Sequence, residues 1–109
     1  MKANDAFAMH KQTGELKMEY VIVRSRDAGV LCGYLKERCR MTNIVVLEQA
    51  RQIWKWEGAF TLVEMANEGI EEASRLSAKS LLPIEVAGVC TILRPSDKAK
   101  EILESLANG

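Results

Sequence analysis

The chain has few of the side chains on which enzymes depend for chemistry. Its 109 residues include one histidine, His10, and three cysteines that form no C-x-x-C pair. These residues cannot supply the spacing of an ordinary zinc site, and an odd number of cysteines argues against a disulfide framework. Phosphate-loop, nucleophile-elbow and dinucleotide-binding glycine motifs are also absent from the sequence. We therefore expect a binding protein rather than an enzyme, with no catalytic residues, no metal and no cofactor.

The chain also lacks net charge and long apolar runs. Fifteen Lys and Arg balance fifteen Asp and Glu, so no overall field draws the protein onto polymeric nucleic acid or a membrane. Any anion must therefore be bound by a local cluster. No apolar run approaches the length of a transmembrane helix, and the N-terminal residues lack the apolar stretch of a secretory signal. Cys32 and Cys90 lie in strand-like segments and are expected to be buried thiols, which fits a cytoplasmic protein.

Apolar, β-branched segments separated by turn residues predict a series of strands. Residues 1–18 show no sustained period and are interpreted as an N-terminal arm, which leaves residues 19–109 as one domain. Gly33 indicates a bulge or a close backbone approach within the second strand. Strands are expected over residues 20–26, 30–37, 42–47 and 84–93, with residues 50–56 either continuing the third strand or forming a fourth.

Two helices are marked by their caps. The sequence T-L-V-E from Thr61 is a capping box that opens a helix over residues 62–68, and Gly69 ends it. Ser96 caps a second helix with one apolar face. Residues 71–82 are expected to form a polar connection. The predicted fold class is α+β, with a small, mostly antiparallel sheet and two helices.

Two tryptophans close together make the third predicted strand a candidate for function. Trp54 and Trp56 are two residues apart, so on a strand their rings leave the same face. They are interpreted either as a stacking platform for a base or as aromatics of the core or of a subunit interface. Residue type alone favours the second interpretation.

Three arginines at strand ends form a candidate anion site. Arg24 and Arg26 alternate with a serine, so on an extended backbone they point to one side, about 6.5–7 Å apart. Two guanidinium groups at that separation could bind two phosphates. Arg94 ends the last strand next to a capped helix whose N-terminus favours an anion, and Thr91 offers a hydroxyl. The alternative is that each arginine is a surface side chain paired with an acid.

Gly58 and Ala59 form a second kind of candidate site. Small residues ahead of a helix expose backbone N–H groups and permit close approach of a ligand. The alternative is tight packing between this turn and a neighbouring segment.

The order of these motifs resembles a known family. The segments YVIVRSRDAGVLCG and ARQIWKWEGAFTLVEMANEG, followed by a closing strand and the PSDKAK helix, are similar to the first type of Thoeris anti-defence protein of bacteriophages. The resemblance covers roughly residues 19–107. It implies a sponge that sequesters cyclic ADP-ribose isomers without cleaving them, in the cytoplasm of the infected bacterium. It also implies assembly from dimers into hexamers, with ligands at subunit interfaces, and for some members a separate site for cyclic trinucleotides of the CBASS pathway.

The resemblance suggests a division of the candidate residues between two ligands. The cyclic ADP-ribose isomer is assigned to Phe7, whose stacking role is inferred from its position in the arm, and to Arg24, Arg94 and the Ser77 loop. The cyclic trinucleotide is assigned to a threefold axis, with Arg26, Thr91 and the Gly58–Ala59 backbone from each copy. Three alternatives remain open: an oligomeric interaction module with no small-molecule ligand, a single-stranded nucleic-acid binder, and an enzyme that degrades the signal.

Overall fold

Three long antiparallel strands form the centre of the sheet. The structure is a computed structural model that describes residues 18–108. Strands β1 (Glu19–Ser25), β2 (Gly29–Cys39) and β3 (Ile44–Lys55) follow one another as a meander. The first turn ends at Gly29, whose φ of 81° lies in the left-handed region that glycine tolerates best. The predicted strand–turn–strand unit at the start of the domain is therefore confirmed.

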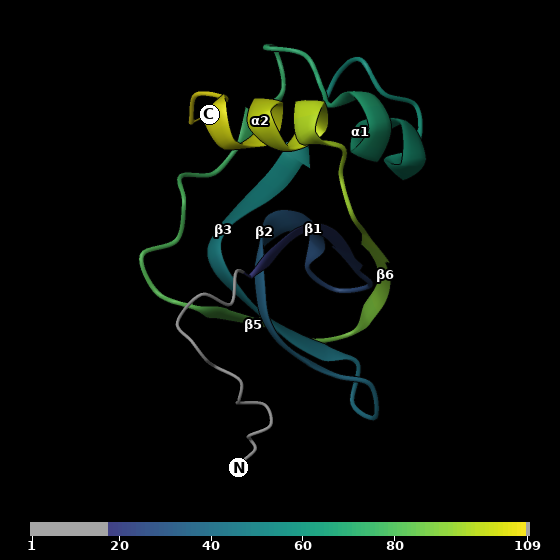
Figure 1. Ribbon diagram of the computed structural model, residues 1–109, viewed down its shortest axis with the longest axis vertical. Helices are drawn as coiled ribbons and strands as arrows, with labels where there is room; N and C mark the ends of the chain where they lie inside the picture. The colour runs from purple at the N-terminus through teal and green to yellow at the C-terminus, as the bar shows by residue number, and fades with distance from the viewer. Residues whose placement is uncertain (1–17, 109) are drawn as a thin grey trace.

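The remaining elements extend this meander and cover it. They are α1 (Leu62–Glu68), β4 (Arg75–Leu76), β5 (Ile84–Val86), β6 (Val89–Leu93) and α2 (Asp97–Ser105). The strand order is β4-β3-β2-β1-β6, and β5 pairs with the first half of β3. Only two residues separate β5 from β6, yet these strands pair with opposite edges of the meander. The sheet consequently curls into a barrel-like ring below the two helices (Figure 1).

The sheet buries side chains on both of its faces. Val21 and Val23 of β1 belong to an apolar cluster that also includes Leu47 and Val86, which fills the inside of the curl. Tyr20 and Ile22 alternate with them and belong to a second cluster. This outer cluster is completed by α1, β4 and α2, through Met65, Leu76 and Leu103. The two helices therefore pack against the outer face of the barrel and cover it.

Two backbone features bend the long strands. Gln49, with φ of 53°, bends β3 but does not end it, so residues 50–56 continue the third strand up to Lys55. Opposite this bend, a Cβ at Gly33 would lie 3.0 Å from Ala50 Cα and 3.0 Å from Glu48 O. The β2–β3 register also shifts between Cys32 and Tyr34. Both parts of the expectation for Gly33, a bulge and a close approach, are confirmed.

The helix predictions are confirmed as well. Thr61 caps α1 by accepting a hydrogen bond of 3.1 Å from Glu64 N, and Gly69 N donates to Met65 O at 2.8 Å. Ser96 caps α2 in the same way. The α+β class with a six-stranded, fully antiparallel sheet and two helices agrees with the predicted fold class.

Four details of the sequence interpretation are wrong. The expected strand over residues 84–93 is split by Gly88, with φ of 68°, and residues 71–82 contain the short strand β4. The second strand continues to Cys39, so its hairpin turn begins later than expected. Cys32 is buried, but Cys90 is exposed, because it lies at a register shift between β1 and β6. Among residues 18–108, no helix is long and apolar enough to cross a membrane.

Candidate anion-binding site

The two arginines near the end of β1 lie in one cavity with both tryptophans. Arg24 is the second-last residue of β1, and Arg26 follows in the turn. Trp54 lies at the end of β3 and Trp56 directly after it, and this end of β3 lies beside the turn because β2 pairs with both strands. The cavity has a volume of about 410 Å³. We call it the tryptophan cavity; its lining residues are Arg24, Ser25, Arg26, Gly29, Val30, Gln52, Ile53, Trp54 and Trp56.

The end of β1 and the turn after it, which carry Arg24 and Arg26, are fixed by hydrogen bonds on several sides. The buried hydroxyl of Ser25 donates to Ala87 O at 2.6 Å and accepts from Ala28 N at 3.1 Å. Arg26 N donates to Gly88 O at 2.9 Å, and Gln52 Nε2 donates to Ala28 O at 3.0 Å. Because these bonds fix the backbone, the Cα positions of Arg24 and Arg26 are preorganised before a ligand binds.

The charge of the tryptophan cavity is positive. None of its lining residues is acidic. Within residues 18–108 no ion pair includes Arg24, and Arg26 pairs only with Asp27, at 3.8 Å with both side chains about four-fifths exposed. An exposed pair of that kind contributes little free energy, so it competes weakly with a bound anion.

The two tryptophans differ in their exposure. Trp54 is 57% exposed, whereas Trp56 is half-buried and packs against the outer apolar cluster. Trp56 therefore fits the core interpretation offered for the pair. Trp54 keeps enough accessible ring surface for the stacking interpretation.

A second cavity adjoins the first and shares both arginines. It has a volume of about 460 Å³, and its other lining residues are Thr42, Asn43, Gly88, Val89 and Cys90. Asn43 and Gln52 contribute polar amides to these two cavities but did not emerge from the sequence. The sequence signal for Asn43 was its place in the β2–β3 hairpin, and the signal for Gln52 was its place two residues before Trp54.

The three predicted arginines do not converge. Arg94 Nε donates to Glu19 Oε2 at 2.7 Å, near the opposite end of β1 from Arg24. Thr91 lies opposite Arg24 in the β1–β6 register, so Arg94 is about 10 Å further along the strand direction. Arg94 thus follows the alternative interpretation of a surface arginine paired with an acid.

Ser77, Gly58 and Ala59 occupy structural positions. Ser77 Oγ accepts a hydrogen bond from Gln52 N at 2.9 Å, which holds the chain beside β3. A Cβ at Gly58 would lie 2.5 Å from Glu71 Cγ, and Ala59 packs against the outer cluster. The tight-packing alternative therefore describes the Gly58–Ala59 turn. Phe7 lies outside the residues that the structure describes.

A larger cavity, of about 780 Å³, lies between α2 and the segment after α1. The charged residues that line it are Glu71 and Glu72. Apolar side chains such as Ile70 and Leu106 also line it. Carboxylates repel an anion, so this cavity is a poor candidate for the ligand chemistry that the arginines favour.

Comparison with known proteins identifies the family. Residues 18–103 match the family described as Domain of unknown function (DUF6948). The chain belongs to DUF6948. The match spans the whole sheet, α1 and most of α2, so every residue of the tryptophan cavity lies within the DUF6948 domain. No curated protein and no solved structure matches the chain.

Proposed function

We propose that this DUF6948 chain binds a phosphate-containing cyclic nucleotide in the tryptophan cavity and sequesters it without cleaving it. The phosphates bind Arg24 and Arg26, and a base stacks on Trp54. Following the resemblance, the proposed ligands are cyclic ADP-ribose isomers and cyclic trinucleotides, and the proposed role is that of an anti-defence sponge in the cytoplasm of an infected bacterium. The observation that carries the proposal is one cavity that combines two arginines, two tryptophans and no carboxylate.

The chemistry of the cavity suits such a ligand. Guanidinium groups bind phosphate oxygens through paired, charge-assisted hydrogen bonds. Stacking of a base on an aromatic ring adds about 1–3 kcal/mol. The cavity volume of about 410 Å³ lies within the usual range for small-molecule sites.

The lining residues favour binding over turnover. They include no histidine, carboxylate or thiol, and the one hydroxyl, of Ser25, already donates to Ala87 O. A general base for hydrolysis would have to come from outside the cavity. A sponge needs nanomolar affinity, about −12 kcal/mol, which requires that most of the ligand be enclosed. We propose that a second copy of the chain, in a dimer or hexamer, completes this enclosure.

The geometry changes two of the residue assignments. Arg24 and Arg26 line the same two cavities, which argues against giving one arginine to each ligand. Arg94 lines neither cavity, so we propose no contact between it and the ligand. It becomes a matched control.

Isothermal titration calorimetry with a cyclic ADP-ribose isomer and with a cyclic trinucleotide tests the proposal. Loss of a hydrogen bond to a charged group costs about 1.5–3 kcal/mol, so Arg24→Ala and Arg26→Ala should each lower affinity at least tenfold. Arg94→Ala should leave it unchanged. For the stacking role, Trp54→Ala should weaken binding, whereas Phe60→Ala, at a side chain that is 96% exposed, should not.

Two results would contradict the proposal. One is full affinity in both arginine variants, and the other is no binding of either ligand by the wild type. Mass spectrometry of ligand released by heating the loaded protein separates the mechanisms, since a sponge returns intact ligand and an enzyme returns fragments.

A second candidate function is an oligomeric interaction module without a small-molecule ligand. Its support is a set of large apolar side chains that are almost fully exposed in the single chain, among them Met41, Phe60 and Leu81. It predicts a stable oligomer by analytical ultracentrifugation, together with no change in melting temperature when either cyclic nucleotide is added.

A further inference from the structure

A third cavity extends the positively charged surface beyond Arg24 and Arg26. It has a volume of about 150 Å³ and shares Asn43, Val89 and Cys90 with the second cavity. Arg38 and Thr91 are among its lining residues. We call this third cavity the distal pocket, and the three adjoining cavities together the basic groove.

The distal pocket carries the same kind of charge as the rest of the basic groove. Arg38 is the only charged residue that lines it, and within residues 18–108 no ion pair includes Arg38. Thr91 is exposed and lies opposite Arg24 in the β1–β6 register. The Thr91 hydroxyl thus lies between the strand of Arg24 and the distal pocket, where the Arg38 guanidinium has no acidic neighbour in the lining.

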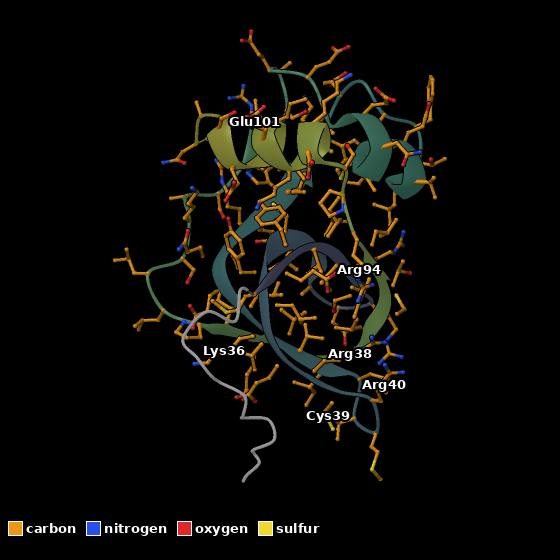
Figure 2. All side chains as sticks on the ribbon, viewed as in Figure 1. Lys36, Arg38, Cys39, Arg40, Arg94 and Glu101 are labelled. Atoms are coloured by element: carbon orange, nitrogen blue, oxygen red, sulfur yellow. The ribbon has the colours of Figure 1, made fainter. Side chains whose placement is uncertain are left out.

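Charge is segregated in this neutral chain. Residues 56–74, which include α1, contain five glutamates and no lysine or arginine. Figure 2 shows Arg38 and Arg40 toward the end of the β2–β3 hairpin, and Glu101 on α2 at the opposite end of the molecule. The distal pocket, which Arg38 lines, thus lies at the hairpin end of the barrel, away from α2, where the field of Arg38 is less cancelled by acidic side chains.

We propose that Arg38 and Thr91 form a further phosphate subsite, and that the basic groove prefers an oligonucleotide with at least three phosphates over a ligand with two. This inference rests on the proposed function of the tryptophan cavity. The reason is spacing: the two phosphates of a diphosphate share an oxygen, whereas those of an oligonucleotide are separated by whole nucleosides. Three arginines from β1, the following turn and β2, distributed over three cavities, match the second arrangement.

The first test compares 5′-phosphorylated di- and triadenylate by calorimetry. The wild type should bind the triadenylate more tightly. Arg38→Ala should lower the affinity for the triadenylate about tenfold, to the level of the diadenylate, and should leave the diadenylate unaffected. Arg40→Ala is the matched control, because Arg40 is an exposed arginine of the same hairpin that lines none of the three cavities. The salt dependence of triadenylate binding should also fall by about 0.7 in slope in Arg38→Ala.

The second test uses the thiols of the unmodified protein as reporters. Cys39 and Cys90 are exposed and line the distal pocket, whereas Cys32 is buried. Hydrogen bonds from the Thr42 side chain and backbone and from the Met41 backbone lower the pKa of the Cys39 thiol, which favours the thiolate that alkylation requires. Saturating triadenylate should slow the alkylation of Cys39, which lines only the distal pocket, several-fold, as followed by peptide mass spectrometry. Saturating diadenylate should not.

The outcomes separate this inference from the proposed function. Equal affinity for the two adenylates, no selective effect of Arg38→Ala, or an unprotected Cys39 thiol at saturation would overturn the distal subsite while the tryptophan cavity stands. Failure of every nucleotide, cyclic or linear, to bind the wild type would overturn both.

Discussion

Arg51 provides the sharpest test of how the helical layer is attached to the barrel. Its side chain is 1% exposed, although it carries a full positive charge. Its Nε donates to Ser77 O at 2.8 Å, Nη1 to Leu103 O at 2.8 Å and Nη2 to Asn108 Oδ1 at 3.2 Å. No ion pair among residues 18–108 includes it. One guanidinium thus joins β3 to the loop after β4 and to the C-terminal end of α2.

The effect of Arg51→Met follows from two opposing contributions. Three hydrogen bonds from a charged donor contribute about 1.5–3 kcal/mol each. Removal of the guanidinium regains the several kcal/mol spent on its desolvation, but it leaves buried carbonyls without a partner and removes a cation from a helix C-terminus. We expect the bonds to outweigh the regained solvation, so that the free energy of unfolding falls by about 3 kcal/mol.

Urea unfolding followed by circular dichroism measures this change. With an m-value of about 1.5 kcal/mol/M, a loss of that size lowers the midpoint by about 2 M at unchanged m. Arg75→Met, at an exposed arginine of β4, is the control and should change the free energy of unfolding by less than about 0.5 kcal/mol. A midpoint for Arg51→Met equal to or above that of the wild type would refute the reasoning, because desolvation would then dominate.

Three further predictions concern local features. Gly33→Val should lower the free energy of unfolding by at least about 1–3 kcal/mol in thermal melts, because the new Cβ meets the backbone of Ala50 at 3.0 Å; an unchanged melt would contradict the close approach. A hydrogen bond to Glu104 raises the pKa of Tyr34 to about 12, so the stability it contributes is present below the unfolded pKa near 10 and is lost as pH rises to 12. Tyr34→Phe should therefore flatten the decline in urea midpoint over that window, and an equally steep decline would count against it. Thr61→Ala should cost about 1 kcal/mol in urea unfolding, whereas Thr61→Ser should retain most of the stability; equal losses would exclude the cap.

The features predicted correctly from the sequence are those encoded within a few neighbouring residues. A cap is one such feature: Thr61 bonds a residue three positions away, and Gly69 ends the helix through its own φ. A continuous β-branched run is another, and it explains why β1 could be predicted as a buried strand. The split of the last strand was not predictable in this way. It arises because β5 and β6 pair with different edges of the meander, and that pairing involves residues about 40 and 65 positions away.

The candidate site combines both kinds of information. Alternation of Arg24 and Arg26 and the spacing of Trp54 and Trp56 are local, so the sequence supplied each pair separately. Their meeting in one cavity depends on β2, which pairs with both β1 and β3 and sets the end of β3 beside the first turn. The same long-range register places Arg94 beside Glu19, with which it forms an ion pair, although the sequence context of Arg94 favoured an anion site.

By itself, then, the sequence determined the fold class, the limits of α1 and the start of α2, because short-range sterics and hydrogen bonding decide these. The tertiary structure alone decided which arginines share a cavity and that Cys90 is exposed. Those properties depend on strand register and curvature, which bring together side chains that are distant along the chain.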